Sequence, residues 1–265
     1  MSTATTNTET MTPGTMEKST STPAVKIVPR ADWVAARKEL LIKEKEFTRL
    51  RDDLSRQRRE MPWVKMEKNY QFEGPNGKER LADLFDGRSQ LVVYHFMFGP
   101  GWKEGCPSCS YLADSFDGAT IHLAHRDTSF AVISRATLPE IEAFKKRMGW
   151  RFKWVSSFGT DFNYDFHVSF PKEQAESGKV YYNFETTEFP SEEGPGMSVF
   201  YKKGDEVFHS YSTFARGLDN LVPTYHLLDL TPKGRDEDSL PWTMAWVRHH
   251  DRYDDGKLVD LKTSA

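Results

Sequence analysis

The sequence predicts an α/β domain with a largely buried central sheet, and three observations carry this prediction. Residues 91–98 (LVVYHFMF) and 129–134 (SFAVIS) are nearly continuous apolar runs, typical of parallel strands covered on both faces. A segment with helical spacing, which holds the only two cysteines of the chain, follows the first run. Two further strands joined by a short turn, and then a closing helix, complete the order of elements.

The composition is that of a soluble, folded protein. The chain has 265 residues, 38% of them hydrophobic, and a formal net charge of −3. No apolar run approaches the roughly 18 residues of a membrane-spanning helix, and no basic excess suggests a nucleic-acid surface. Residues 1–29 are Ser/Thr-rich and lack the apolar core of a secretory signal, so we expect a disordered tail on a cytoplasmic protein.

Residues 30–62 have the pattern of one long helix. Its apolar side chains recur every seven positions: Trp33, Leu40, Phe47 and Leu54. Lys43 and Gln57 interrupt the seam that a strict coiled coil needs. We therefore expect an amphipathic helix that docks on its own domain rather than a dimerising helix.

Residues 63–231 form the predicted domain, and its elements can be assigned in order. The expected elements are a strand at 70–72, a turn at 74–77, a helical turn at 81–85, strands at 91–98 and 129–134, a helix opened by the capping box of Thr137 and Glu140, a strand at 152–155, strands at 198–201 and 206–211, and a helix at 218–230. Residues 159–196 give mixed signals and are predicted to be an insertion. Residues 232–265 form a polar C-terminal extension.

This order of elements favours a thioredoxin-like fold. A βαβ half followed by a ββα half is the thioredoxin arrangement, and the strand, turn and helical turn that precede it are the entry of the peroxiredoxin-like branch. The predicted fold class is thus α/β, thioredoxin-like, with a central sheet flanked by helices, a long N-terminal helix and a C-terminal extension.

The motif Cys106-Pro107-Ser108-Cys109 is the most informative feature for function. Thiol-disulfide exchange needs a thiolate nucleophile and a second thiol close enough to resolve the mixed disulfide. Cys106 is expected at the start of a helix, where free N–H groups and the helix dipole favour an anion and lower a thiol pKa. Cys109, one turn later, is expected to be more buried and to act as the resolving thiol.

Two other kinds of chemistry compete for these cysteines. His122 and His125 follow at a spacing that resembles a zinc finger but is one residue short, and the residues between read as helix, so we predict no metal and no cofactor. Peroxiredoxins carry a Pro and a Thr or Ser at fixed distances before the reactive cysteine. Here Pro100 lies six residues before Cys106 with no hydroxyl side chain between them, which disfavours an efficient peroxidase.

Two residues outside the motif are candidates for substrate binding. Trp102 precedes Cys106 and is placed to shape the pocket, although plain packing explains it equally well. Pro195 lies before the strand at 198–201, near the point where thioredoxins carry a substrate-binding cis-proline. Its spacing to the following Lys202 and Gly204 is one residue longer than in thioredoxins, so a simple loop proline is at least as well supported.

Four segments resemble one known family: YHFMFGPGWKEGCPSCS, ISRATLPEIEAFKKRMGWRFKWVSS, TDFNYDF and YSTFARGLDNL. The family is the domain of unknown function 899 family, largely bacterial and described as predicted dithiol-disulfide oxidoreductases. The resemblance covers roughly residues 33–253. It implies the thioredoxin-like fold and a catalytic role for Cys106 and Cys109 alone.

The sequence therefore favours a dithiol-disulfide oxidoreductase that uses its CPSC motif. Its expected partners are a protein or small-molecule disulfide and a cellular reductant, without nucleic acid or membrane, and a homodimer stays open. One alternative is a thiol peroxidase or redox sensor that uses Cys106. Another is a non-catalytic binding protein that keeps the fold and holds a metal at the thiols.

Overall fold

The computed structural model describes residues 25–253. Its strands are β1 (Val64–Lys65), β2 (Gln71–Gly74), β3 (Gly77–Arg80), β4 (Gln90–His95), β5 (Thr128–Ser134), β6 (Lys153–Ser156), β7 (Lys179–Tyr182), β8 (Glu185–Glu188), β9 (Gly196–Lys203) and β10 (Glu206–Phe214). Its helices are α1 (Arg30–Glu60), the 3-10 turn η1 (Asp83–Phe85), α2 (Pro107–Ala113), α3 (Phe116–Ala124), α4 (Leu138–Arg147), α5 (Phe162–Asp165), α6 (Lys172–Ser177), the 3-10 segment η2 (Ala215–Leu221) and α7 (Pro223–Leu228).

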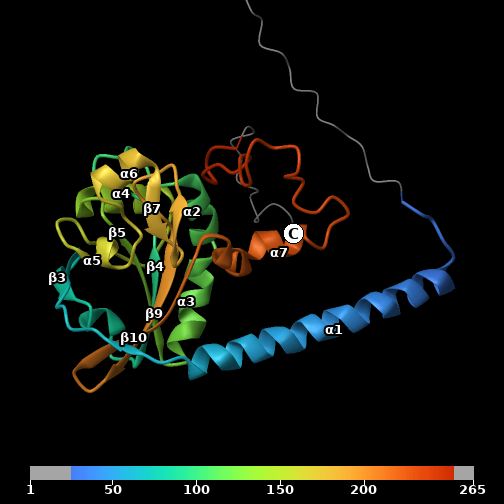
Figure 1. Ribbon diagram of the computed structural model, residues 1–265, viewed down its shortest axis with the longest axis horizontal. Coiled ribbons are helices and arrows are strands. Elements are labelled where there is room, and N and C mark those ends of the chain that lie inside the picture. Colours follow the sequence, from blue (N-terminus) through green and yellow to red (C-terminus); the bar gives the residue numbers. More distant parts are fainter. Residues whose placement is uncertain (1–24, 254–265) are drawn as a thin grey trace, which may run out of the picture.

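One mixed sheet organises the domain, and its strand order is β1-β10-β9-β4-β5-β6-β2-β3. β4, β5 and β6 run parallel, and the hairpin of β9 and β10 joins them antiparallel through β9. Helices flank this sheet (Figure 1). The thioredoxin-like fold is thus confirmed, with the β2–β3 hairpin and η1 as the predicted entry.

The two faces of the sheet bury two separate clusters of apolar side chains. Alternation along β4 sends Val93 to one cluster and Tyr94 to the other, as strand geometry requires. The second cluster holds Cys109 and is rich in aromatic residues, among them Phe96, Phe144 and Trp154. The cysteines therefore belong to one face of the sheet only.

The strand predicted at 91–98 ends earlier, at His95. The following residues stay buried although they leave the ladder, because Phe96 N–H donates to the Ile133 carbonyl (3.0 Å) and Ala136 N–H donates to the Phe98 carbonyl (2.7 Å). These bonds tie the loop of residues 96–105 to the end of β5. The loop that delivers Cys106 thus starts from a fixed base.

Two predicted helices are each divided in two. The segment with helical spacing that holds the cysteines is α2 followed by α3, and the two helices are separated at Asp114 and Ser115. The helix expected at 218–230 is η2 followed by α7, because Pro223 has no N–H to continue a helix and instead starts a new one. The capping box of Thr137 and Glu140 opens α4 as predicted.

The predicted insertion, residues 159–196, forms α5, α6 and a separate two-stranded sheet of β7 and β8. Tyr182 connects this insertion to the domain. Its hydroxyl donates to the Pro195 carbonyl (2.6 Å) and accepts from the Ala215 N–H (3.0 Å). The insertion therefore holds the chain on both sides of the β9–β10 hairpin.

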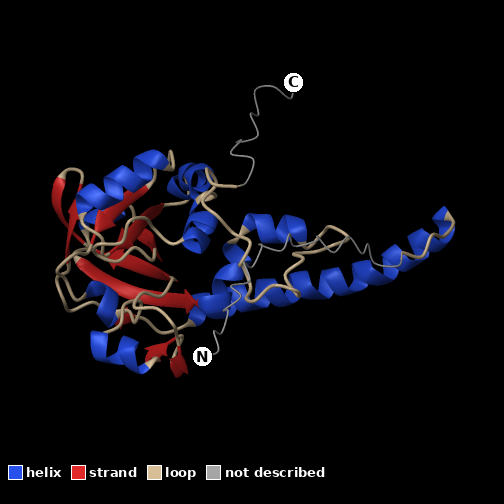
Figure 2. Cartoon of the chain, turned by 90° about the horizontal axis from the view of Figure 1, so that it is seen from above, coloured by secondary structure: helices blue, strands red, loops and turns tan. Residues whose placement is uncertain are grey.

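The long N-terminal helix is confirmed as α1, but only its C-terminal half lies against the domain, where Phe47 and Leu54 border a groove that Tyr211 lines from the other side. No side chain of α1 is buried by the described part of the chain. The helix meets the domain over its C-terminal half, and its N-terminal half projects away from the domain (Figures 1 and 2). No helix within residues 25–253 is long and apolar enough to cross a membrane.

The two predicted terminal segments are described only in part. Residues 1–24 of the expected disordered tail lie outside the described residues, and 25–29 have neither helix nor strand. Of the C-terminal extension, residues 232–253 are described and run as turns without regular elements, whereas 254–265 lie outside the description.

Candidate active site

Cys106 occupies the N-cap position of α2, with Pro107 at the first helical position, as the sequence predicts. The preceding Gly105 packs so closely that an added Cβ would lie 2.5 Å from the Phe96 ring and 2.8 Å from the Phe144 ring. Cys106 N–H donates to the Met97 carbonyl at 3.0 Å. Loop packing and this hydrogen bond together place Cys106 at the open end of the helix.

The two thiols have different environments. Cys106 is half-buried, whereas Cys109 is 2% exposed, and the two cysteines are free and 3.9 Å apart. The hydrogen bond from the Cys109 thiol is the largest cause that lowers the pKa of Cys106, to about 7. The backbone N–H groups of Cys109 and Ser108 lower it further, against the effect of burial. The lowered pKa favours the thiolate form of Cys106.

Cys109 has the opposite electrostatic setting. Burial raises the pKa of the Cys109 thiol well above its usual range, and the neighbouring Cys106 raises it further. Tyr94, near the end of β4, is fully buried beside it and stays protonated, because burial raises its pKa. Cys109 is thus a protonated donor toward Cys106. The roles of the two cysteines as nucleophile and resolving thiol stay a prediction.

A cavity of about 90 Å³ opens beside the two thiols. Its lining is mostly apolar and comes from Tyr94, Met97, Cys106, Ser108, Cys109, Leu112, Pro195, Ala215, Leu218, Asp219, Val222 and Met244. The structure therefore brings Pro195 together with both cysteines, and the described residues contain no cis peptide bond. A substrate-binding role for Pro195 stays a prediction.

Trp102 is not among the residues that line this cavity. Its indole N–H donates to a Glu192 carboxylate oxygen at 2.9 Å, and its ring lies against Gly99 in the approach loop. The structure thus shows a packing contact for Trp102, and its proposed contact with substrate stays a prediction. The neighbouring Glu193 is buried and paired with Arg135 (2.9 Å), and burial raises the pKa of Glu193 to about 7.

The two histidines considered as metal ligands lie elsewhere. His122 is near the end of α3 and His125 follows that helix, and neither lines the cavity beside the thiols. Within residues 25–253 no group of three or more His, Cys, Asp or Glu side chains has the geometry to hold a metal ion.

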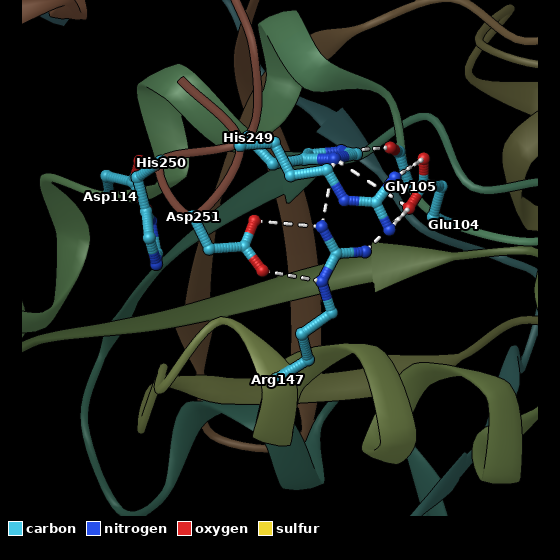
Figure 3. Close-up of polar contacts among 8 residues, drawn as sticks. Glu104, Gly105, Asp114, Arg147, His249, His250 and Asp251 are labelled. Carbon is cyan, nitrogen blue, oxygen red and sulfur yellow. Dashed lines mark hydrogen bonds and ion pairs between the residues drawn. The ribbon is translucent and has the colours of Figure 1, made fainter. Parts of the chain in front are cut away.

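The C-terminal extension contacts the loop that carries Cys106 (Figure 3). His249 is 3% exposed, and its Nε2 lies 2.8 Å from the Gly105 carbonyl oxygen. Arg147, at the end of α4, donates to Nδ1 of His249 (3.3 Å) and also binds Glu104 (2.6 Å) and both carboxylate oxygens of Asp251 (2.8 Å each). A buried histidine and a three-way ion cluster therefore hold the extension against the approach loop.

The contact with Arg147 fixes the tautomer of His249. A guanidinium only donates hydrogen bonds, so Nδ1 of His249 must be the acceptor and the proton sits on Nε2. Nε2–H then donates to the Gly105 carbonyl, while the N–H of the same peptide unit, that of Cys106, donates to Met97. Both polar groups of the Gly105–Cys106 peptide are thus bound, which fixes the plane of the peptide directly before the thiol. We call these contacts of residues 249–252 with the approach loop the C-terminal clasp.

Sequence reasoning did not find the clasp. The run His249-His250-Asp251 is visible as a polar feature, but its partners Glu104 and Arg147 are far away in the chain and share no pattern with it. His250 makes a separate contact, from Nδ1 to a carboxylate oxygen of Asp114 at the end of α2 (2.7 Å). The aromatic and apolar residues of the cavity, such as Tyr94 and Leu218, give only the signal of core positions.

Comparisons with solved structures find proteins of low similarity. A mutant of Xylella fastidiosa PrxQ matches with 12% identity and a TM-score of 0.41, over 62% of this chain and 94% of the other. Peroxidoxin BcpB from Mycobacterium tuberculosis matches with 14% identity and a TM-score of 0.37, over 62% and 95%. The mitochondrial 2-Cys peroxiredoxin from Plasmodium falciparum gives 14% and 0.37, over 62% and 92%.

No curated protein matches the sequence. The sequence profile described as "Bacterial protein of unknown function (DUF899)" matches residues 22–253, and the chain belongs to this family.

Proposed function

We propose that this protein is a dithiol-disulfide oxidoreductase in which Cys106 is the nucleophile and Cys109 the resolving thiol. The observation that carries the proposal is the geometry of the pair. Cys106 is half-buried at the N-terminus of α2 and borders a cavity, and Cys109 is buried 3.9 Å away. The lowered pKa of Cys106 and the raised pKa of Cys109 agree with these roles.

The reaction proceeds in two exchanges. The Cys106 thiolate attacks one sulfur of a substrate disulfide, the substrate S–S bond breaks, and the leaving sulfur departs as a thiolate that takes up a proton. Cys109 then loses its proton and attacks Cys106, which releases the second substrate thiol and leaves a Cys106–Cys109 disulfide. A cellular dithiol reduces this disulfide and is itself oxidised, so electrons pass from that dithiol to the substrate.

The surroundings of the thiols suit the second exchange. In the mixed disulfide, Cys106 no longer carries a negative charge, so the charge that raises the pKa of Cys109 is gone. The pKa of Cys109 should fall at that stage, which makes it a better nucleophile when it is needed. The mostly apolar cavity favours a disulfide with an apolar flank.

Trapping of the intermediate tests the proposal. In Cys109→Ser the resolving thiol is missing, so a mixed disulfide on Cys106 should accumulate with insulin or with a small aromatic disulfide. Mass spectrometry of the intact chain measures the adduct. Cys106→Ser, which keeps the buried thiol, is the matched control and should form little adduct.

Failure to trap any adduct, together with no disulfide reduction by the wild type, would reject exchange chemistry. Peroxide provides the second arm of the experiment. Fast and stoichiometric peroxide consumption by Cys109→Ser, without disulfide reduction by the wild type, would replace the proposal with a thiol peroxidase. The absence of a hydroxyl side chain between Pro100 and Cys106 makes that result unexpected.

A further inference from the structure

Helix α1 presents a long apolar stripe that the described part of its own chain does not cover. The helix has 31 residues and no buried side chain. The exposed fractions of the stripe residues are large: Trp33 47%, Leu40 52%, Phe47 62% and Leu54 43%. Contiguous apolar surface of this kind on a soluble protein marks an interaction site, and an isolated helix draws most of its stability from a packed face.

The domain of the same chain approaches this stripe at one end without covering it. Phe47, Leu50 and Leu54 border an open groove of about 340 Å³ that Tyr211 and Leu221 line from the other side. Leu50 nonetheless stays 56% exposed. The N-terminal half of α1 projects further from the domain (Figure 2).

The spacing of the stripe is that of a coiled coil. Alternating intervals of three and four residues place Trp33, Leu40, Phe47 and Leu54 at heptad position a and Ala36, Lys43, Leu50 and Gln57 at position d. The repeat covers more than three heptads without a shift in phase. Such a seam is buried when a second helix packs along it.

The charged residues beside the seam are segregated by sign. Position g, on one flank, is acidic in every heptad: Asp32, Glu39, Glu46, Asp53 and Glu60. Position e, on the other flank, is basic in four of five cases: Arg30, Arg37, Arg51 and Arg58, with Glu44 as the exception. Residues at e and g set the partner and the orientation of a coiled coil, because they face each other across the seam.

This pattern selects a parallel pair of identical helices. In a parallel pair, each g residue faces the e residue five positions later on the other helix, so Glu46 meets Arg51 and Asp53 meets Arg58. An antiparallel pair would place acidic flank against acidic flank and basic against basic. The exception places Glu39 of one copy opposite Glu44 of the second, a like-charge contact. Two cations lie near Glu44 to offset it: Lys43 of the other copy, at the adjacent d position, and Arg37 of its own helix, which binds it at 2.8 Å.

We propose that α1 pairs in parallel with α1 of a second copy of this chain, and that the protein is a homodimer joined by this coiled coil. Lys43 and Gln57 within the seam lower its stability and at the same time restrict its register. The charge pattern is self-complementary, which is why a second copy is the occupant. This inference is independent of the proposed thiol chemistry.

The test uses the full chain and light scattering after gel filtration. The wild type should have twice the 30.6 kDa mass of one chain. Leu40→Glu with Phe47→Glu should be monomeric, and circular dichroism should show an intact sheet. A wild type that is monomeric at every concentration would overturn the proposal, as would a dimer that both substitutions leave unchanged.

Charge reversal tests the occupant and the orientation. One variant carries Arg37→Glu, Arg51→Glu and Arg58→Glu, and a second carries Asp32→Lys, Glu46→Lys and Asp53→Lys. Each alone should dimerise roughly 100-fold more weakly than the wild type, and an equimolar mixture should recover a one-to-one heterodimer. Recovery in the mixture cannot come from a folding defect.

The matched control reverses three basic residues on the outer face of the same helix: Lys38→Glu, Lys45→Glu and Arg59→Glu. It changes the net charge as much as the first variant does, and it should dimerise like the wild type. Equal weakening in this control would mean that overall charge, not the flank pattern, governs association, and would overturn the parallel pairing. A third outcome would also overturn the proposal: the wild type is a monomer, and protease cuts α1 only after residues 1–24 have been removed. In that case residues 1–24 of the same chain, not a second copy, would cover the apolar stripe.

Discussion

The two ends of the domain differ in a way that secondary structure alone does not suggest. The N-terminal end is one regular helix of 31 residues with no buried side chain, and it lies against the domain only over its C-terminal half. The C-terminal end, residues 229–253, has no regular helix or strand, yet it buries Val247 and His249 and reaches the loop before Cys106. The irregular C-terminal segment, and not helix α1, therefore contacts the loop that carries Cys106.

Side-chain contacts explain this difference. Glu237 in the C-terminal segment accepts hydrogen bonds from the Tyr225 hydroxyl (2.9 Å) and from the Trp246 indole N–H (2.7 Å). Arg235 stacks over the Tyr225 ring at 3.8 Å from its centre. Such contacts order a segment without a backbone ladder. Helix α1 satisfies its backbone internally and so forms a regular element without needing the domain.

Deletion of each end tests the comparison with the largest expected effect. Removal of residues 232–265 deletes buried side chains and the clasp, so the free energy of unfolding should fall by about 3–5 kcal/mol and alkylation of Cys106 at pH 7 should slow several-fold. Removal of residues 1–60 should change the free energy of unfolding by less than about 1 kcal/mol, because nothing in α1 is buried.

Urea titration of both truncated chains at one low protein concentration measures the two effects. The low concentration removes any contribution from self-association. If the N-terminal deletion lowered the free energy of unfolding as much as the C-terminal deletion, or more, the comparison would be wrong.

His249→Ala sharpens the comparison at a single side chain. It frees the Gly105 carbonyl and leaves Arg147 without one acceptor, so the free energy of unfolding should fall by about 1–3 kcal/mol. The Gly105–Cys106 peptide gains freedom to rotate, the N–H groups of α2 no longer point steadily at the thiolate, and the pKa of Cys106 should rise. The pH dependence of iodoacetamide labelling measures this rise.

His249→Gln and His250→Ala are the controls. Gln keeps an N–H near the position of Nε2 and should restore most of the labelling rate. His250 bonds to Asp114 rather than to the approach loop, so its loss should leave the labelling of Cys106 nearly unchanged. If all three variants changed the labelling rate of Cys106 equally, the clasp would stabilise the fold in general and would not position the Gly105–Cys106 peptide.

Acid should release the C-terminal segment first. The hydrogen bond from Arg147 lowers the pKa of Asp251 to about 2, below the ordinary value near 4. A carboxyl with a lowered pKa stabilises the fold above its unfolded pKa, and this contribution is lost as the pH falls from about 4 to 2. Pepsin, which works in this range, should begin to cut within residues 244–253 as the pH falls through it. Cleavage there that does not vary with pH would exclude the Asp251 ion pair as the anchor.

The sequence was sufficient for features that depend on local pattern. Periodicity located the central strands and α1, and the capping box of Thr137 and Glu140 located α4. The CPSC motif placed Cys106 at a helix start because Pro107 is tolerated only there. In each case the residues that decide the structure are neighbours in the chain.

Features that depend on distant contacts were missed or wrong. Docking of α1 was expected from its apolar stripe, but amphipathicity shows only that a helix needs a partner, not that the partner is its own domain. His249 pairs with Gly105 across more than a hundred residues, and Tyr182 in the insertion bonds to Pro195 and Ala215. No repeat or motif in the sequence encodes these pairings.

The most direct test of the account is the titration of the Cys106 thiol in the reduced protein, by the pH dependence of its alkylation rate. The structure predicts a midpoint near pH 7 for Cys106 and no labelling of Cys109 in the same range. Cys109→Ala should move the midpoint upward, because the hydrogen bond from the Cys109 thiol is the largest cause that lowers this pKa. A midpoint at the ordinary value of about 8.5, unchanged in Cys109→Ala, would contradict the assignment of Cys106 as an activated nucleophile.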